Sequence, residues 1–477
     1  MKMGCFKPTI EVSLLITFFS FELLGSVGTN LMIYRTCYLI LGYNETECAL
    51  LGNTNNKTIE KLEKLVQPTV NIIDTTKSMI EQIITLGVCI FTAQLSDKYG
   101  RKPVLIVAQI GMVLGLFIMA VFSYFPNISP WYFLFASIPS MLTGGFSTFL
   151  VVTLSYISDV TTEDTRGVRM AIMEGIIGLG ILCGSISSSY LFYATNYPSV
   201  YAIAGGISTL GIIYTIFFVP ESLKNINREG EITVKNLLMS FNFKELFKVF
   251  TKKRPNYDRA IIFLMTAMLT LYIFGQSSGN KTFLFLTSKF TWTLTEYTWY
   301  TSISSIFFMI GGIFGTLIIH KYLKTTESVA VLMGFMSEMN GFLVRGLATR
   351  SRDIYLSAGV KLLGGIISPQ CRTLVARLVP TDEVAKLFSL ITVVESVCGI
   401  AASPFFTLIY NSTVNIDPAI YNFVVAGLCG ICVILAVIII ILENLSTQNY
   451  SELTNDEDRA SSNSEGVIES TPTITVN

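Results

Sequence analysis

The sequence predicts an all-α polytopic membrane protein built from two six-helix halves, and three observations lead to this fold class. Of the 477 residues, 51% are hydrophobic and only 14% are charged, whereas soluble domains carry about 25% charged residues. About twelve stretches approach the ~20 mostly apolar residues that a membrane-spanning helix needs. A long basic segment after the sixth stretch divides the chain into two sixes, the arrangement of a duplicated transporter.

The predicted spans follow from applying the length criterion along the chain. Each boundary is set by where the apolar run gives way to charged or turn-forming residues. The predicted spans are residues 10–33, 79–96, 103–124, 131–156, 168–190, 200–219, 259–286, 298–319, 328–348, 354–375, 387–410 and 421–442.

The polar segments between these spans set the predicted domains and topology. Residues 1–220 form the first half, and residues 259–442 form the second. The linker 221–258 is rich in lysine and arginine, and basic loops stay cytoplasmic. An even number of spans then places both termini in the cytoplasm. The tail 443–477 is polar and acidic without periodicity, so we expect it to be disordered.

Composition also excludes several function classes. Lys+Arg 33 against Asp+Glu 33 gives no net charge, so the sequence offers no basic surface for nucleic acid. A single histidine and the lack of clustered Cys/His spacings argue against a structural zinc site, and we expect no metal or cofactor. No loop offers a nucleophile–base pair, so we do not expect an enzyme.

The loop of residues 34–77 is predicted to lie outside. Cys37 and Cys48 fall in this loop, where an oxidising compartment permits a local disulfide. Asn44 and Asn56 begin N-glycosylation triplets in the same loop, and Asn411 begins another in a second predicted outer loop. Such triplets are common by chance, but here they agree with the predicted topology.

A short charged turn joins the second and third spans and runs Ser-Asp-Lys-Tyr-Gly-Arg-Lys from residue 96. Gly100 allows a tight backbone turn. Asp97 can pair with Arg101 or with the amino end of a neighbouring helix, and such a pairing would latch helices in one state. The plainer alternative is a basic cytoplasmic loop. The D-x-x-G-R-K spacing resembles the loop between helices two and three of major facilitator superfamily transporters, with Ala93 in place of that pattern's first glycine.

Several ionised side chains within the predicted spans need a reason, because a charge at membrane depth costs at least about 2.5–3.5 kcal/mol. Burial favours the neutral form of a carboxyl, so Glu174 and Glu395 are candidate proton carriers. Arg372 follows a helix-kinking proline and offers a planar fork to an anionic substrate. The alternatives are a packing carboxyl for Glu174 and a structural pairing of Arg372 with Glu174 or Glu395.

Other polar side chains carry weaker signals. We expect Asn280 and Lys361 to line the cavity, and Lys281 to snorkel towards the outer end of its span. Glu338 and Arg345 share a helix face and are expected to offset one another. In the tail, Tyr450 and Leu453 form a Tyr-x-x-apolar motif of the kind that clathrin adaptors bind, a pattern that also arises by chance.

Several of these features occur together in one branch of the superfamily. The chain resembles solute carrier family 46, which includes the proton-coupled folate transporter and lysosomal relatives. The matching pieces are Tyr34-Arg35-Thr36-Cys37, residues 43–48, residues 96–102, the set Arg166, Arg169 and Glu174, residues 368–372, residues 376–379 and residues 387–389.

The resemblance implies a twelve-helix major facilitator fold and a proton-coupled carrier of amphipathic organic anions in the plasma membrane or a lysosomal or endosomal membrane. It implies proton coupling at Glu174, substrate and proton handling at Arg372, and gating at Asp97 and Arg101. Glu395 matches an acidic position of the lysosomal branch. Ile273 replaces a histidine of the folate carrier, and the central-loop histidine has no counterpart, which argues against folate itself.

We therefore expect a secondary active transporter that works by alternating access, with Asp97–Arg101 helping to hold the outward-facing state. Its partners would be a small organic anion, protons and the lipid bilayer. Three alternatives stay open. They are a facilitative uniporter of the same fold, a drug–proton antiporter of the same fold, and a substrate-sensing receptor without turnover.

Overall fold

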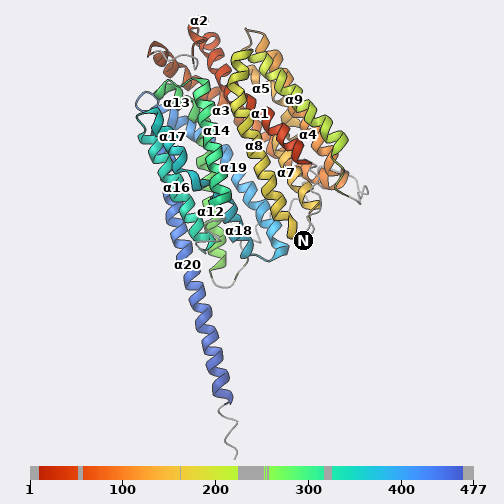
Figure 1. Cartoon of the computed structure of the whole chain (residues 1–477), viewed down its shortest axis with the longest axis vertical. Helices are drawn as coiled ribbons and strands as arrows, with labels where there is room; N and C mark the ends of the chain where they lie inside the picture. The colour runs from red at the N-terminus through yellow and green to blue at the C-terminus, as the bar shows by residue number, and fades with distance from the viewer. Residues whose placement is uncertain are drawn as a thin grey trace, which may run out of the picture.

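The computed structural model describes residues 10–51, 57–161, 163–223, 252, 254, 257–315 and 325–465. Within these ranges the regular elements are all helical and none is a strand. The predicted all-α class is therefore confirmed. Figure 1 shows the helices of the first half, from red to yellow, beside those of the second half, from green to blue.

In the first half, α1 packs against α8 and α9, while α4 packs against α7 and α9. These contacts enclose a core between long apolar helices. The elements are α1 (Ile10–Arg35), η1 (Thr36–Ile40), α2 (Glu45–Cys48), α3 (Lys57–Tyr99), α4 (Arg101–Tyr124), η2 (Pro130–Tyr132), α5 (Phe133–Ala136), α6 (Ile138–Leu142), α7 (Gly145–Asp159), α8 (Glu163–Ala194) and α9 (Tyr197–Phe218).

In the second half, α16 packs against α17, α18 and α20, while α12 packs against α19 and α20. The elements are α12 (Asp258–Gln276), η3 (Ser277–Lys281), α13 (Thr282–Phe290), α14 (Leu294–Ile310), η4 (Gly311–Gly315), α16 (Glu327–Leu347), α17 (Ser351–Val360), η6 (Leu362–Ile366), α18 (Ile367–Arg377), α19 (Thr381–Thr413) and α20 (Ile420–Glu465).

Each predicted span overlaps one of these helical segments, and 8 segments of the described chain are long and apolar enough to cross a membrane. The count of twelve crossings stays a prediction. Several spans are broken rather than continuous. In the predicted span 131–156, for example, the chain turns at Gly144, whose φ of 71° favours glycine. Broken helices at membrane depth are tolerated where they are buried in protein or line a cavity.

Helix α3 differs most from the sequence prediction. We expected an outer loop up to residue 77, but α3 begins at Lys57 and continues to Tyr99. Polar residues that made this segment resemble a loop find partners in the second half instead. The Gln67 amide, for example, donates to the carbonyl oxygen of Leu284 at 2.9 Å and accepts from the Tyr410 hydroxyl at 2.8 Å.

The true loop at this end of the molecule is short and closed by a disulfide. Cys37 and Cys48 are bonded to each other, as predicted, and both are buried. Arg35, also buried, donates to the backbone carbonyls of Ser123 and Phe125 at 2.9 and 2.7 Å, which ties α1 to the end of α4. We call this the disulfide end. The opposite end, which carries the turn at Gly100, is the motif end.

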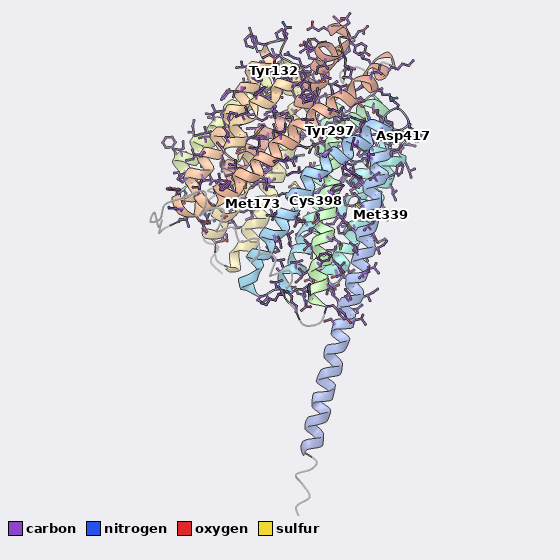
Figure 2. All side chains as sticks on the ribbon, turned by 180° about the vertical axis from the view of Figure 1, so that it is seen from behind. Tyr132, Met173, Tyr297, Met339, Cys398 and Asp417 are labelled. Atoms are coloured by element: carbon purple, nitrogen blue, oxygen red, sulfur yellow. A yellow bond between two sulfur atoms is a disulfide. The ribbon has the colours of Figure 1, made fainter. Side chains whose placement is uncertain are left out.

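The buried apolar core shows how the two halves meet. At the disulfide end, one cluster includes residues of both halves, such as Val27 and Phe406. Towards the motif end the core divides into a first-half cluster around Tyr156 and a second-half cluster around Phe335. In Figure 2, Tyr132 and Asp417 mark the disulfide end, whereas Met173 and Cys398 lie closer to the motif end. In the described part of the chain, the halves therefore share a buried core at the disulfide end and have separate cores towards the motif end.

Polar pairs reinforce this contact between the halves. Asn71 on α3 donates to Asn411 on α19 at 3.0 Å, and the hydroxyls of Thr75 and Thr407 are hydrogen bonded one turn further along. We call these two pairs the contact layer. Hydroxyl pairs also join α8 to α14 at this end, namely Ser189–Thr298 and Ser185–Thr301.

The two ends of the described chain lie at the motif end, where α20 projects away from the bundle (Figure 1). We expected residues 443–477 to be disordered, whereas α20 continues without a break to Glu465. The turn before Glu443 is already helical in the bundle, so the polar segment extends an existing helix and needs no new nucleus. Residues 466–477 and most of the linker 221–258 lie outside the described residues.

Candidate functional site

A cavity of about 770 Å³ lies between the halves. Most of its wall comes from the first half, from α1, α3, α4, α9 and the segments α5 to α7, and one side comes from α12 and α19. Glu395 on α19 lines it, twelve residues before Thr407 of the contact layer, which is about 18 Å along a helix axis. The cavity therefore extends from the closed disulfide end towards the motif end.

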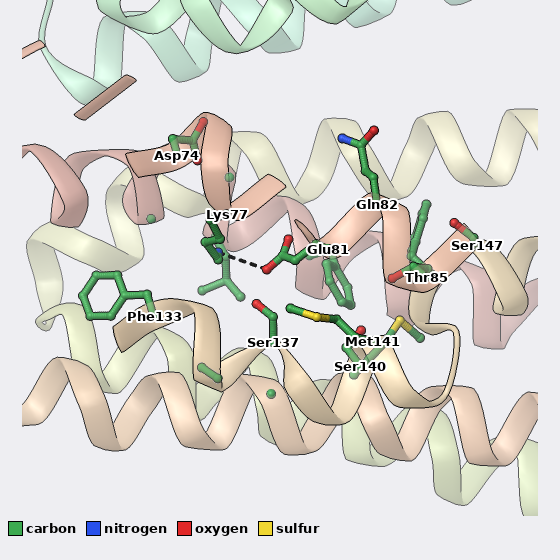
Figure 3. Close-up of a pocket in the computed structure, with 18 of the residues that line it drawn as sticks. Asp74, Lys77, Glu81, Gln82, Thr85, Phe133, Ser137, Ser140, Met141 and Ser147 are labelled. Carbon is green, nitrogen blue, oxygen red and sulfur yellow. Dashed lines mark ion pairs between the residues drawn. The ribbon is translucent and has the colours of Figure 1, made fainter. Parts of the chain in front are cut away.

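Charged side chains line the cavity along one face of α3. Asp74, Lys77 and Glu81 are separated by three and four residues, the spacing that aligns side chains on a helix. Lys77 Nζ lies 3.5 Å from Glu81 Oε1, and their side chains are 25% and 29% exposed. Figure 3 shows this pair, with Asp74 one turn before it and Thr85 one turn after it. We call Asp74, Lys77 and Glu81 the α3 strip.

The rest of the first-half wall is largely apolar. Phe21 and Phe133 line it together with several methionines. Methionine is flexible and polarizable, so such a wall adapts to guests of irregular shape. The cavity thus combines one charged face with apolar surroundings, which suits an amphipathic guest. The lining methionines are Met32, Met112, Met119 and Met141.

The second half contributes an acid–base pair at the cavity wall. Arg372 Nη2 on α18 donates to both carboxylate oxygens of Glu395, at 3.1 and 3.2 Å. Its Nε lies 3.4 Å from Ser368 Oγ. Glu395 lines the cavity, but Arg372 is not among the lining residues. Of the two readings of Arg372, the pairing with Glu395 is the one present in this conformation.

Two other predicted substrate contacts lie elsewhere. Lys361 is paired with Glu338 at 3.0 Å and sits over the ring of Phe342, 3.6 Å from its centroid. Asn280 is exposed in η3. Neither residue lines the cavity. Glu174 is on α8, but its side chain lies outside the described residues.

One further expectation about a buried charge is wrong, and the expected attraction between Glu338 and Arg345 is present but is not the direct contact of either side chain. Lys281 does not snorkel: it is 1% exposed, and its Nζ donates to Asn71 Oδ1 at 3.0 Å. Arg345 Nε donates to Asn422 at 2.6 Å, while Glu338 takes Lys361 as its ion-pair partner. In both cases the partner comes from a helix distant in sequence, so local spacing does not reveal it.

The sequence interpretation missed the α3 strip. Asp74 and Lys77 were assigned to an outer loop because the apolar window begins only at residue 79, and Glu81 fell inside the predicted span without being singled out. A signal was present nonetheless: Gln67, Asn71, Asp74, Glu81 and Thr85 recur at spacings of three, four or seven residues. This is the period of a helix with one polar face.

At the motif end, Arg101 joins three elements. It is ion-paired with Asp97 on α3, its Nε donates to Asp159 Oδ2 at the end of α7 at 2.9 Å, and its Nη1 donates to Ser96 Oγ at 2.7 Å. The expected Asp97–Arg101 pair is therefore confirmed. The gating role of the pair stays a prediction.

The amino end of α4 holds Glu221 rather than Asp97. The Glu221 carboxylate accepts from the backbone amides of Arg101 at 2.8 Å and Lys102 at 3.1 Å. A carboxylate is favoured there because the first helical amides lack partners and the helix dipole is positive. Gly100 makes the approach possible: its φ is 105°, and a Cβ there would lie 2.5 Å from Glu221 Oε2.

Replacing Glu221 with alanine is expected to lower stability by about 0.5–2 kcal/mol, because the first amides of α4 lose their acceptor. The midpoint of thermal unfolding of the purified protein measures this. The variant Glu221→Gln keeps one acceptor oxygen and should lie between wild type and Glu221→Ala. Equal midpoints for all three proteins would contradict the capping role.

The predicted modification sites have different surroundings. Asn44 is exposed and caps α2, where its Oδ1 accepts from the Thr46 amide at 3.0 Å. Asn411 Nδ2, the atom to which a glycan would attach, donates instead to the Pro68 carbonyl at 3.1 Å. Asn56 lies outside the described residues, as do the side chains of Tyr450 and Leu453. Glycosylation and the adaptor motif stay predictions.

Comparison with known proteins decides the family. Residues 82–403 match the sequence model of the Major Facilitator Superfamily, which is more than half of the chain. The chain belongs to the Major Facilitator Superfamily. It is a multi-pass membrane transporter of that type and not an enzyme.

Similar curated proteins come from solute carrier family 46, which confirms the resemblance. The chain is 29% identical to the probable peptidoglycan muropeptide transporter SLC46 of Drosophila melanogaster, over 89% of this chain and 84% of that protein. It is 24% identical to the proton-coupled folate transporter of Bos taurus, over 91% of both chains. It is 22% identical to the lysosomal proton-coupled steroid conjugate and bile acid symporter SLC46A3 of Gallus gallus, over 81% and 85%.

Solved structures agree at the level of fold. The human organic anion transporter MFSD10 superposes with a TM-score of 0.61 at 15% identity, over 90% of this chain and 97% of that chain. A peptide transporter POT in complex with sulfate gives a TM-score of 0.62 at 13% identity, over 93% and 96%. At such identities the likeness concerns the arrangement of helices alone.

Proposed function

We propose that this protein is a proton-coupled symporter of amphipathic organic anions, with two six-helix halves that alternate access to one central site. The observation that carries the proposal is the cavity of about 770 Å³, whose apolar methionine wall faces charged side chains from both halves. Among the described residues the buried core is continuous between the halves at the disulfide end and divided towards the motif end, so the conformation fits one end state of a rocking cycle.

The relatives support the substrate class. Their names refer to muropeptides, folate, steroid conjugates and bile acids, and two of them are described as proton-coupled. These molecules share an acidic group on a larger body. Ile273 lines the cavity at the position where the resemblance to the folate carrier implies a histidine. We therefore do not include folate in the proposal.

The Arg372–Glu395 pair offers a physical route to coupling. While Glu395 is ionised, its carboxylate occupies the Arg372 fork. A proton on Glu395 removes the charge that holds the fork, so the guanidinium becomes available to a substrate anion. Proton and anion would then enter the site together. Glu174 is the second proposed proton carrier, on α8 of the other half.

Uptake by Glu395→Gln is expected to be nearly equal at pH 5.5 and pH 7.4, whereas wild-type uptake should rise several-fold at pH 5.5. Glutamine keeps the size of the side chain but cannot gain or lose the proton. Radiotracer uptake of a panel of organic anions into cells measures this. Glu327→Gln is the matched control, because Glu327 also pairs with an arginine, Arg377, but lies outside the cavity. A wild-type pH profile for Glu395→Gln would contradict the role of Glu395.

The same uptake panel separates the alternatives. Uptake without any pH dependence in wild type indicates a facilitative uniporter, and uptake driven by an opposite proton gradient indicates an antiporter. Counterflow in reconstituted vesicles identifies a receptor, because a receptor exchanges nothing. We propose a plasma or lysosomal membrane location with both termini in the cytoplasm. Surface labelling and fractionation of cells test it.

A further inference from the structure

We propose that the α3 strip binds a dipolar head group, so that the preferred substrates are amphipathic anions that also carry a free amine. The inference rests on the proposed transport function and narrows its substrate class. In this arrangement a substrate ammonium lies against the carboxylates of the strip, and a substrate carboxylate lies against Lys77. The apolar part of the substrate contacts the methionine wall.

The charges at the cavity surface favour a guest that carries both a negative and a positive group. Among the lining residues of the described chain, the carboxylates are Asp74, Glu81 and Glu395, and the cation is Lys77. Two further cations, Arg372 and Lys281, stand behind this surface and are not among the lining residues. Arg372 offsets the charge of Glu395, and Lys281 attracts Asp74 from behind the surface. The charges left to a guest are those of Lys77 and Glu81, one of each sign. A guest with negative charge alone can pair with Lys77 but leaves Glu81 without its partner, whereas a guest that also carries an ammonium satisfies both.

The cations behind the surface are already engaged. Arg372 is held by both oxygens of Glu395, and buried Lys281 donates to Asn71 in the contact layer. Lys281 is therefore part of the closed contact between the halves, not of the open cavity. Among the described lining residues the cation is Lys77, which lies between Asp74 and Glu81 along the α3 strip.

The geometry of the Lys77–Glu81 pair allows a guest to separate its two partners. Its atoms are 3.5 Å apart, which is longer than the ~2.7–2.9 Å of a strong charge-assisted hydrogen bond. Both side chains are partly exposed to the cavity, so the pair is weakly held and easily separated. A guest with an ammonium beside a carboxylate can replace each partner with its own group, and no charge is then left without a counter-charge.

The opposite wall fits the remainder of such a guest. Figure 3 shows Ser137 and Met141 across the cavity from Glu81, with Phe133 further along the same wall. A hydroxyl can hydrogen bond an ammonium or carboxylate, while the thioether and the ring contact apolar groups. The strip is thus the charged side of a site whose other side is mainly apolar.

The test compares two probes that differ only in the amine. One is a muramyl peptide that ends in a diamino acid with a free side-chain amine, and the other is the same peptide with that amine acetylated. Binding to the purified full chain is measured by microscale thermophoresis, with taurocholate as an anion that has no amine. We expect at least tenfold tighter binding of the free amine by wild type.

Variants of the strip assign the preference to it. Glu81→Gln should bring the two muramyl probes to nearly equal affinity. The double variant Lys77→Glu/Glu81→Lys keeps an ion pair in the strip, so it controls for variants that fail to fold. It should still bind the muramyl probes, but the ratio of their two affinities should differ from that of wild type. Asp417→Asn is the matched control, since Asp417 pairs with Lys289 outside the cavity. It should keep the wild-type ratio.

Equal or tighter binding of the acetylated probe overturns the inference, and so does a tenfold preference that survives in Glu81→Gln. Binding of taurocholate without either muramyl probe also overturns it, while the proposed transport of organic anions stands. Uptake and counterflow in vesicles are measured in parallel. If no probe moves in them, the proposed transport fails, whereas the amine preference in binding is still decided by the purified protein.

Discussion

Gly311→Ala is expected to abolish the yield of folded protein or to lower its unfolding midpoint sharply. Gly311 begins η4, where the chain lies directly against η6, and a Cβ at this position would overlap the Leu362 carbonyl oxygen and lie 2.5 Å from its carbonyl carbon. These are backbone atoms, which cannot rotate away. Overpacking costs about 1–3 kcal/mol where side chains adjust, and occasionally more. We expect a loss at or above the upper end of that range.

The adjacent glycine provides a matched control. A Cβ on Gly312 would lie 3.4 Å from the nearest atom, the Gly365 carbonyl oxygen, which is ordinary contact. Gly312→Ala should therefore remain close to wild type in detergent-solubilised yield and in unfolding midpoint. The pair of variants separates close packing from a general loss of helix flexibility. Similar stability for Gly311→Ala and Gly312→Ala would show that η4 and η6 are not closely packed in the membrane.

Lys361→Met is expected to destabilise the second half by about 3–5 kcal/mol, the usual cost of breaking a buried ion pair by removing one partner. Glu338 is 2% exposed and pairs with Lys361 at 3.0 Å. Methionine retains the aliphatic length that packs on Phe342 but has no positive charge. The carboxylate of Glu338 would then be buried without its ion-pair partner. Thermal unfolding of the purified variant measures the loss.

The double variant Lys361→Met/Glu338→Gln tests the reason for that loss. Glutamine has nearly the size of glutamate and carries no charge, so the double variant should recover most of the unfolding midpoint lost in Lys361→Met. If the double variant is no more stable than the single one, the cost comes from lost packing on Phe342 and not from the stranded carboxylate. Arg345 is left unchanged in both proteins, since it is bonded to Asn422.

The contacts at the motif end show which partners a local sequence pattern predicts and which it does not. Asp97 and Arg101 are four residues apart across the turn at Gly100, so their pairing is predictable from the sequence and occurs in the structure. The acceptor at the start of α4 is Glu221, more than a hundred residues away. A sequence shows that an amino end needs an anion, but not which distant carboxylate reaches it.

Helix α3 shows that a hydropathy criterion can begin a helix too late. Its polar residues lowered the local hydropathy, and a window that counts apolar residues therefore began the span at residue 79 instead of Lys57. The helix is stable with these residues because Gln67 and Asn71 hydrogen bond to the second half, and Asp74, Lys77 and Glu81 face a cavity. A hydropathy window assumes that a helix faces lipid, whereas the polar side of α3 faces the second half and the cavity.

The sequence by itself determined the helical membrane class, the division into two halves, the Cys37–Cys48 bond and the charged turn at Gly100. All of these depend on composition or on residues close together in the chain. Only the tertiary structure decided that Arg372 holds Glu395, that Lys361 holds Glu338 and that Lys77 and Glu81 face the cavity. A buried charge takes its partner from whichever helix packs beside it, and that choice is made by packing.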